Sequence, residues 1–174
     1  MRGLMHIYCG DGKGKTTAAV GLAVRAFGTG KKVLFVQFMK GGKTGELQTF
    51  QKLSDITVLR SDKKFPFYHQ MTDEQKKEQT AIHNVILEKA AQALEKGEFE
   101  ILILDEVTYP YQWEMLDRQK LIELLDHAKG HAEVICTGRN PAQELLSRAD
   151  YITEMKCMRH PYEKGIAARE GIEY

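Results

Sequence analysis

The sequence predicts an α/β protein built on one doubly wound, mostly parallel sheet. Short apolar segments alternate with segments of helical periodicity along the chain, without an internal linker. A glycine- and lysine-rich loop separates the first apolar segment (residues 4–8) from the first helical one (residues 18–27). With 174 residues and 43% apolar content, the chain is long enough for a sizeable core. We therefore expect a single domain over residues 1–174.

The composition indicates which binding partners and which cellular compartment to expect. The 25 Lys and Arg nearly balance the 24 Asp and Glu, unlike the basic composition of many nucleic-acid-binding domains. Cys9, Cys136 and Cys157 lack the spacing of metal ligands or of a disulfide framework. No apolar run approaches the ~20 residues that cross a bilayer, and the glycine loop begins too early for a signal peptide. We expect a cytoplasmic protein without nucleic-acid or membrane partners.

The glycine loop predicts a nucleoside triphosphate site. Its glycines let backbone N–H groups turn toward phosphate oxygens, which the N-terminus of the following helix also attracts. Lys15 can reach a terminal phosphate, and the Thr16 hydroxyl can bind magnesium. The expected nucleotide-binding residues are Gly10, Asp11, Gly12, Lys13, Gly14, Lys15, Thr16 and Thr17.

One position departs from the standard phosphate-loop pattern, because Cys9 stands where the first glycine is expected. The alternative to a phosphate site is an ordinary glycine-rich turn capped by Thr16. The strand–loop–helix context favours the phosphate site, and with it a sheet of the P-loop NTPase (RecA-like) type.

The next elements follow from periodicity. Residues 33–38 are continuously apolar, as in a strand covered on both faces. A glycine-rich loop leads to a short helix over residues 47–53 and a strand over residues 56–59. Residues 60–71 then lack periodicity but contain Phe65, Phe67 and Tyr68. Composition leaves two readings open for these aromatic rings: packed under the core, or exposed for a ligand.

A long helix and an acidic strand end follow. Residues 72–75 have the form of a capping box, and the helical pattern runs to Gly97. A buried strand over residues 99–106 ends in Asp105 and Glu106. In phosphate-loop proteins the strand beside the loop ends in an acid that binds magnesium or its water. The alternative is a pair of solvated acids.

The remaining elements complete the alternation. A helix begins at Asp117, and a strand over residues 132–137 leads to Gly138 and Arg139. Asn140 and Pro141 have the pattern of an N-cap and first helical position, and a last strand covers residues 151–155. Ligands of such sheets bind at the carboxyl ends of the strands, so we expect the glycine loop, residues 37–38, 105–106 and 137–139 to converge on one site.

Several of these stretches together resemble the ATP:corrinoid adenosyltransferases of the CobA/CobO/BtuR type. That family also lacks the first glycine of the loop. The resemblance extends from about Ile7 to the last residue, and its motifs are the glycine loop, residues 33–41, residues 104–109, residues 137–139, His160-Pro161, Gly165 and residues 171–174.

The resemblance implies that cobalt(I) of a corrinoid such as cobalamin attacks C5′ of ATP and releases triphosphate. Lys15, Glu106 and Asp105 are then the expected catalytic residues. Thr16 and Glu106 are expected to bind Mg²⁺, with Asp105 in a supporting, loop-positioning role. Arg25 and Arg139 match family arginines near the nucleotide, although a surface role for Arg25 has equal weight.

The resemblance also assigns the aromatic residues to the corrinoid. Phe65 and Phe67, with Tyr68 beside them, match a Phe-x-Trp pair that lies on the lower face of the corrin and excludes its axial ligand. Phe67 stands where the family has tryptophan. The family further implies a reductant such as an electron-donating flavoprotein, and a homodimer is a further expectation.

Two other functions are weighed against adenosyl transfer. One is a P-loop small-molecule kinase or NTPase, against which the lack of an arginine-rich lid argues. The other is a non-catalytic, ATP-dependent corrinoid carrier, against which Lys15 and Glu106 argue only weakly.

Overall fold

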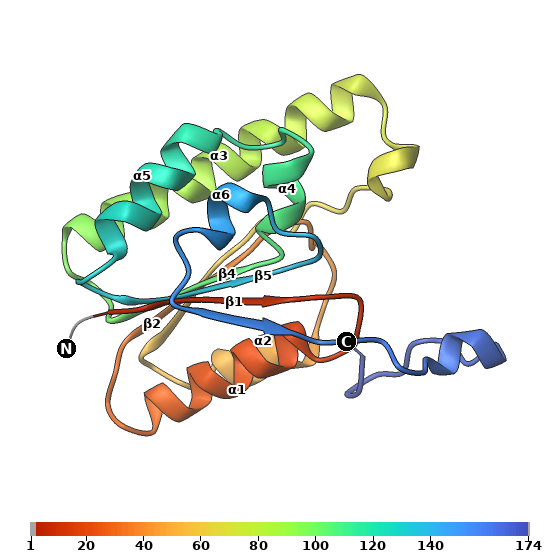
Figure 1. Ribbon diagram of the computed structural model, residues 1–174, viewed down its shortest axis with the longest axis horizontal. Coiled ribbons are helices and arrows are strands. Elements are labelled where there is room, and N and C mark those ends of the chain that lie inside the picture. The colour runs from red at the N-terminus through yellow and green to blue at the C-terminus, as the bar shows by residue number, and fades with distance from the viewer. Residues whose placement is uncertain (1–2, 174) are drawn as a thin grey trace.

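The computed structural model describes residues 3–173 and confirms the predicted α/β class (Figure 1). Six strands form one sheet: β1 (Met5–Cys9), β2 (Val33–Gln37), β3 (Ile56–Leu59), β4 (Ile101–Asp105), β5 (Glu133–Thr137) and β6 (Tyr151–Glu154). Their order is β3-β2-β4-β5-β1-β6, and every neighbouring pair is parallel. All six carboxyl ends therefore meet at one edge.

Helices cover both faces of this sheet (Figure 1). On one face lie α1 (Lys15–Phe27) and α2 (Gly45–Phe50). On the other lie α3 (Asp73–Glu95), α4 (Thr108–Gln112), α5 (Arg118–Ala128) and α6 (Gln143–Leu146). Two short 3-10 helices, η1 (Tyr68–Gln70) and η2 (Pro161–Lys164), interrupt irregular segments.

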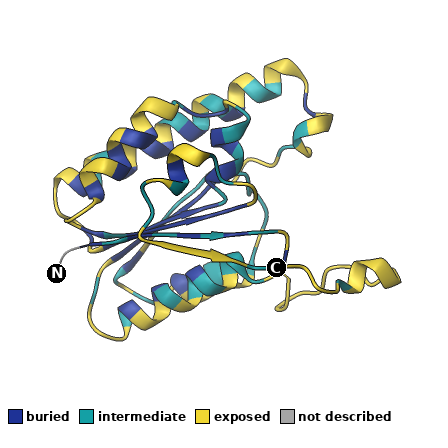
Figure 2. Cartoon of the chain, in the orientation of Figure 1, coloured by how far each residue is buried: buried dark blue, intermediate teal, exposed yellow. Residues whose placement is uncertain are grey.

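The core is split by the sheet into two layers. Leu102 and Leu104 of β4 pack toward α3 and α5, whereas Ile101 and Ile103 pack toward α1. All four are buried because the central strands are covered on both faces, as their continuous apolar runs predict. Figure 2 shows the contrast with β6 and the C-terminal arm (residues 155–173), which are largely exposed.

The strand order corrects one expectation. The acid-bearing strand β4 does not lie beside the loop strand β1, because β5 is inserted between them. Periodicity identifies strands but says nothing about their neighbours. The insertion places Thr137, at the end of β5, between the loop and the acids.

Helix boundaries were predicted with mixed success. The capping box of α3 is confirmed: Thr72 Oγ1 accepts from the Gln75 N–H at 3.3 Å, and Gln75 Oε1 accepts from the Thr72 N–H at 3.0 Å. The helix expected from Asn140 instead begins at Gln143. Asn140 has φ of +45°, a left-handed conformation unlike that of an N-cap, so this prediction was wrong.

Some elements start or end elsewhere than periodicity suggested. The first helix begins at Lys15, so the predicted nucleotide loop includes its first turn. The short helix α4, which contains Pro110, had no sequence signal. Tyr174, the last residue of the C-terminal motif, lies outside the described residues. Within residues 3–173, no helix is long and apolar enough to cross a membrane.

Candidate active site

The glycine loop is shaped by left-handed turns and by a close backbone neighbour. Gly10 and Gly14 have φ of +96° and +118°, which disfavour a side chain. The Gly12 N–H donates to Met155 O at 2.7 Å, just beyond β6. A Cβ added at Gly10 or Gly12 would collide with that oxygen. Met155, just after the end of β6, therefore supports the loop through this hydrogen bond and close packing.

Lys15 lies folded over this loop. Its Nζ donates to Gly10 O at 2.7 Å and to Gly12 O at 2.8 Å. Burial lowers the pKa of Lys15, and the nearby charge of Arg139 lowers it further. An ammonium group has three donors, so Lys15 retains one for an incoming phosphate without leaving the loop.

Asp105 is the centre of the site. Its side chain is fully buried, and its Oδ1 accepts from the hydroxyls of Thr16 at 2.8 Å and Thr137 at 2.7 Å. Its Oδ2 accepts from Lys40 Nζ at 2.9 Å and Gln37 Nε2 at 3.3 Å. We call these five residues the Asp105 cluster. Each carboxylate oxygen of Asp105 already accepts two hydrogen bonds. Asp105 is therefore suited to orienting Thr16 rather than to direct metal binding.

Glu106 differs from its neighbour in conformation and exposure. It has φ of +61°, an uncommon value for a residue with a side chain, and its N–H donates to Thr137 Oγ1 at 2.9 Å. Its carboxylate is partly exposed and lies 3.5 Å from Lys40 Nζ. Burial raises the pKa of Glu106, while Lys40 acts in the opposite direction. Unlike Asp105, this carboxylate remains available to a ligand.

Lys40 was not assigned a role from the sequence. It follows β2 at the same sheet edge and lies within residues 33–41, the stretch that resembles the family, and these were the available signals. Burial lowers the pKa of Lys40, but Asp105 and Glu106 raise it more, and the net shift is upward. Its ammonium is also 3.4 Å from Thr16 Oγ1.

The residues present fit a magnesium ion. Lys40 Nζ already lies between Thr16 Oγ1 and the Glu106 carboxylate, so this position stabilises a cation. Hydroxyl and carboxylate oxygens are ligands that Mg²⁺ prefers, usually together with substrate phosphates. Among residues 3–173, no group of three or more His, Cys, Asp and Glu is arranged to hold a metal ion.

The two arginines expected near the nucleotide lie in different places. Arg139 reaches the loop, with its Nε 3.3 Å from Asp11 Oδ1. Its backbone is held by Thr108, whose hydroxyl donates to Arg139 O at 2.9 Å. Arg25 is exposed in the last turn of α1. The helix rise places it about 15 Å along the axis from Lys15, so the structure does not bring Arg25 to the loop.

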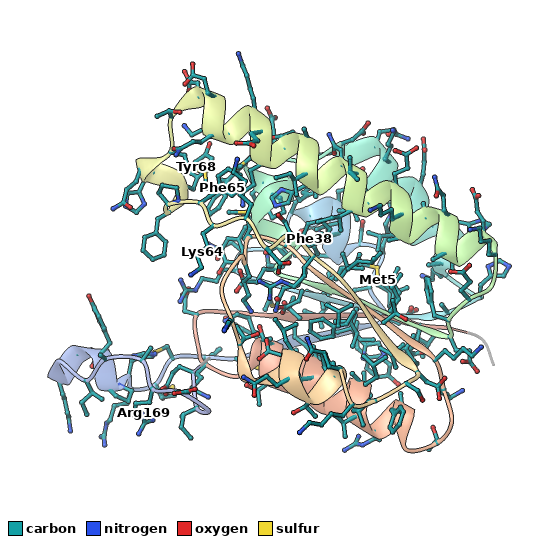
Figure 3. The ribbon with its side chains drawn as sticks, turned by 180° about the vertical axis from the view of Figure 1, so that it is seen from behind. Met5, Phe38, Lys64, Phe65, Tyr68 and Arg169 are labelled. Atoms are coloured by element: carbon teal, nitrogen blue, oxygen red, sulfur yellow. The ribbon has the colours of Figure 1, made fainter. Side chains whose placement is uncertain are left out.

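The aromatic segment (residues 60–71) is neither fully packed nor fully free. Phe65 is half-buried, whereas Phe67 is 74% exposed. Tyr68 stacks on Trp113, with ring centroids 4.3 Å apart and planes 11° from parallel. Trp113 also contacts Tyr109 at 5.3 Å. Figure 3 shows Phe65 and Tyr68 on the segment that leads into α3.

Trp113 and Tyr109 were missed by sequence reasoning. Both follow the acidic strand end, in or just after α4. Trp113 is the only tryptophan in the chain, which was the one available signal. Together with Tyr68 they form an aromatic row that connects the acidic strand end to the aromatic segment.

Comparison with known proteins gives one consistent result. The family model for "ATP:corrinoid adenosyltransferase BtuR/CobO/CobP" matches residues 1–174. The corrinoid adenosyltransferase of Escherichia coli (strain K12) is 32% identical over 175 residues, which cover 99% of this chain and 86% of that protein. CobA of Salmonella typhimurium (strain LT2), also a corrinoid adenosyltransferase, gives the same values. A corrinoid adenosyltransferase from Sinorhizobium sp. is 30% identical, with 99% and 81% covered.

Proposed function

Because the chain belongs to the BtuR/CobO/CobP family of ATP:corrinoid adenosyltransferases, it carries out the ATP-dependent adenosylation of corrinoids, and we propose how its residues divide that reaction. The loop and the Asp105 cluster bind and activate the triphosphate. The aromatic segment binds the corrinoid. The observation that carries this assignment is the contact of Thr16 with Asp105 across the sheet edge.

The proposed reaction needs no nucleophile from the protein. The electron pair of a cobalt(I) corrinoid attacks C5′ of ATP and forms the cobalt–carbon bond. The C5′–oxygen bond breaks, and its electron pair leaves with triphosphate, so that cobalt(I) becomes cobalt(III). The protein must align cobalt, C5′ and oxygen and stabilise the charge on the leaving group. Cys9 immediately precedes the glycine loop, and burial raises the pKa of its thiol. A protonated thiol is a poor nucleophile, so this sulfur does not compete with cobalt(I).

The loop residues supply the charge stabilisation in this proposal. Lys15 and the N–H groups at the start of α1 bind triphosphate oxygens, and Arg139, which contacts Asp11 of the loop, adds a second positive charge. Thr16 and Glu106 would hold Mg²⁺, while Asp105 fixes the Thr16 hydroxyl. When bound, the metal neutralises negative charge on the triphosphate.

The aromatic segment is proposed to contact the corrin. The exposed ring of Phe67 offers apolar surface that water disfavours, and Phe65 and Tyr68 extend it. An electron donor outside the chain, such as a flavoprotein, must supply the cobalt(I) state. We place this chemistry in the cytoplasm, in keeping with the three free cysteines.

One assay tests the proposal. The protein is mixed with ATP, Mg²⁺ and chemically reduced cob(I)alamin under argon. The spectrum reports the cobalt–carbon bond, and phosphorus NMR identifies the released phosphate species. We expect adenosylcobalamin and triphosphate in equal amounts. Release of ADP would instead indicate a kinase or NTPase, and binding without any product would indicate a carrier.

A further inference from the structure

A second set of contacts leads from the Asp105 cluster toward the aromatic segment. Gln37, the last residue of β2, is 1% exposed, and its Nε2 donates to Asp105 Oδ2 at 3.3 Å. Its Oε1 accepts from Arg60 Nη1 at 2.7 Å. One buried amide therefore joins the acid of the nucleotide site to the first residue of the aromatic segment.

Arg60 is a charged side chain in an enclosed position. Its side chain is 8% exposed, and its nearest carboxylate, that of Asp62, is 3.8 Å away and fully in solvent. The guanidinium instead donates to neutral oxygens: Gly42 O at 2.8 Å and Lys40 O at 3.4 Å, besides Gln37. Enclosing a cation without a buried counter-ion is unfavourable, so this arrangement is better explained by a need for position than by stability.

The backbone around Lys40 also touches the aromatic segment directly. A Cβ added at Gly41 would collide with Lys63 O, so only glycine allows this approach. Met39 has φ of +58°, which places the turn after β2 in a conformation uncommon for a residue with a side chain. Residues 39–42 thus have little freedom to move independently of residues 60–64. Figure 3 shows Lys64 and Phe65, which follow Lys63 in the aromatic segment.

We propose that Gln37 and Arg60 are positioning residues that couple nucleotide binding at the Asp105 cluster to the placement of the aromatic segment. This inference rests on the proposed function, because it assigns the corrinoid to Phe65, Phe67 and Tyr68. Magnesium triphosphate competes with Lys40 for Thr16 and Glu106, so Lys40 must adjust when the nucleotide binds. Arg60 holds the Lys40 and Gly42 carbonyls and transmits that adjustment to the corrinoid side.

The proposal predicts a measurable coupling between the two substrates. ATP with Mg²⁺ should tighten corrinoid binding, and by linkage the corrinoid should tighten ATP binding by the same factor. Trp113 provides the signal, because it is the only tryptophan and stacks on Tyr68. Cob(II)alamin is the probe: it absorbs light, quenches nearby fluorescence and lacks the nucleophilic electron pair of cobalt(I).

The experiment measures the Kd of cob(II)alamin with and without ATP and Mg²⁺ under argon. We expect a ratio of about 5-fold or more in the wild type, the usual lower range of coupling between sites. In Gln37→Met and in Arg60→Lys the ratio should approach 1. In Arg60→Lys, whose side chain lies outside the Asp105 cluster, the Kd for ATP alone should change by less than about 3-fold. Arg60→Lys keeps the charge but loses the forked donors, so it also serves if Gln37→Met fails to fold. Lys52→Met, an exposed position after α2, is the matched control.

The outcomes separate this inference from the proposed function. The coupling role is overturned if ATP and Mg²⁺ leave the Kd of cob(II)alamin unchanged in the wild type. It is also overturned if Gln37→Met and Arg60→Lys fold and keep the same ratio of Kd values as the wild type. Both results apply even if adenosylation is intact. The coupling role is supported if the ratio of Kd values approaches 1 in both single variants and the double variant loses no more coupling than either single variant. Failure of cob(II)alamin to quench Trp113, or unchanged binding by Phe67→Ala, would instead contradict the placement of the corrinoid.

Discussion

The proposed nucleotide side and the proposed corrinoid side of the site are built in opposite ways. At the nucleotide side, Asp105 at the end of β4 is fully buried and accepts four hydrogen bonds. The donors come from the start of α1, from the ends of β2 and β5, and from Lys40 just after β2. At the corrinoid side, Phe67 is 74% exposed and lies in an irregular segment. Stabilising charge on a leaving group requires fixed donors, whereas a large flat substrate requires open surface. The difference predicts that mutations on the two sides will affect stability and activity in different proportions.

The largest effect is expected for Asp105→Asn. The substitution removes the negative charge opposite Lys40 and places an N–H group among donors. We expect the free energy of unfolding in urea to fall by about 3 kcal/mol and adenosylation to fall by about 100-fold or more. Asp126→Asn is the control, because its pair with Arg148 is at the surface and should contribute less than about 1 kcal/mol. Equal losses in the two variants would contradict a rigid nucleotide side.

Lys15→Ala should separate activity from stability. The ammonium binds only loop carbonyls in the absence of nucleotide, so the free energy of unfolding should change by less than about 1 kcal/mol. The value of kcat/KM should fall by about 100- to 1000-fold, because a cation on the leaving group is lost. Steady-state kinetics with cob(I)alamin and urea titrations measure the two quantities, with Lys52→Ala as control. A loss of activity below 10-fold would remove Lys15 from the catalytic residues.

Phe67→Ala tests the open side. We expect adenosylation that starts from cobalt(II) and a reductant to slow by about 10-fold, the factor for about 1.4 kcal/mol of lost apolar contact. Adenosylation of chemically prepared cobalt(I) should change far less, and thermal stability should not change. Val85→Ala, another exposed apolar residue, is the control. Equal losses in both assays would remove the role of Phe67 on the lower face of the corrin.

The smallest expected effect concerns Glu106 and the acidic side of the plot of kcat/KM against pH. Burial raises the pKa of Glu106, so a carboxylate that must be ionised to bind Mg²⁺ becomes protonated at a higher pH than an ordinary glutamate. Activity should therefore decline as pH falls through this raised pKa. The same shift affects stability in the opposite way. Because the folded-state pKa of Glu106 lies above the unfolded value, this group favours the folded state at low pH, and its contribution is lost as pH rises through the folded-state pKa. A profile of kcat/KM that shows no difference between the wild type and Glu106→Gln in this range would contradict the assignment.

The sequence was sufficient for the parts of the site that local pattern determines. Gly10–Thr17, Asp105-Glu106 and Arg139 could be placed together because the carboxyl ends of parallel strands meet at one edge. The insertion of β5 between β1 and β4 could not be predicted, because strand order depends on packing over the whole sheet. The contacts of Gln37 and Lys40 with Asp105 join residues 68 and 65 positions apart, and no local period records them.

The other differences between sequence and structure have a similar cause. The Asn140-Pro141 pattern is typical of a helix start, but Asn140 is left-handed, and its carbonyl accepts a hydrogen bond from the Gln112 side chain. Trp113 follows a five-residue helix that periodicity cannot detect, and its value comes only from its stacking on Tyr68. The local sequence pattern thus predicted candidate phosphate-binding residues, whereas the contacts that join them to the aromatic segment are visible only in the three-dimensional structure.

The contact between Gly12 and Met155 has a consequence for how the protein matures. Gly12 precedes β2 to β6 in the chain, and Met155 follows β6. Their hydrogen bond can therefore form only after β6 has been synthesised and has paired with β1. Until then the glycine loop lacks this contact, although all of its own residues are already present.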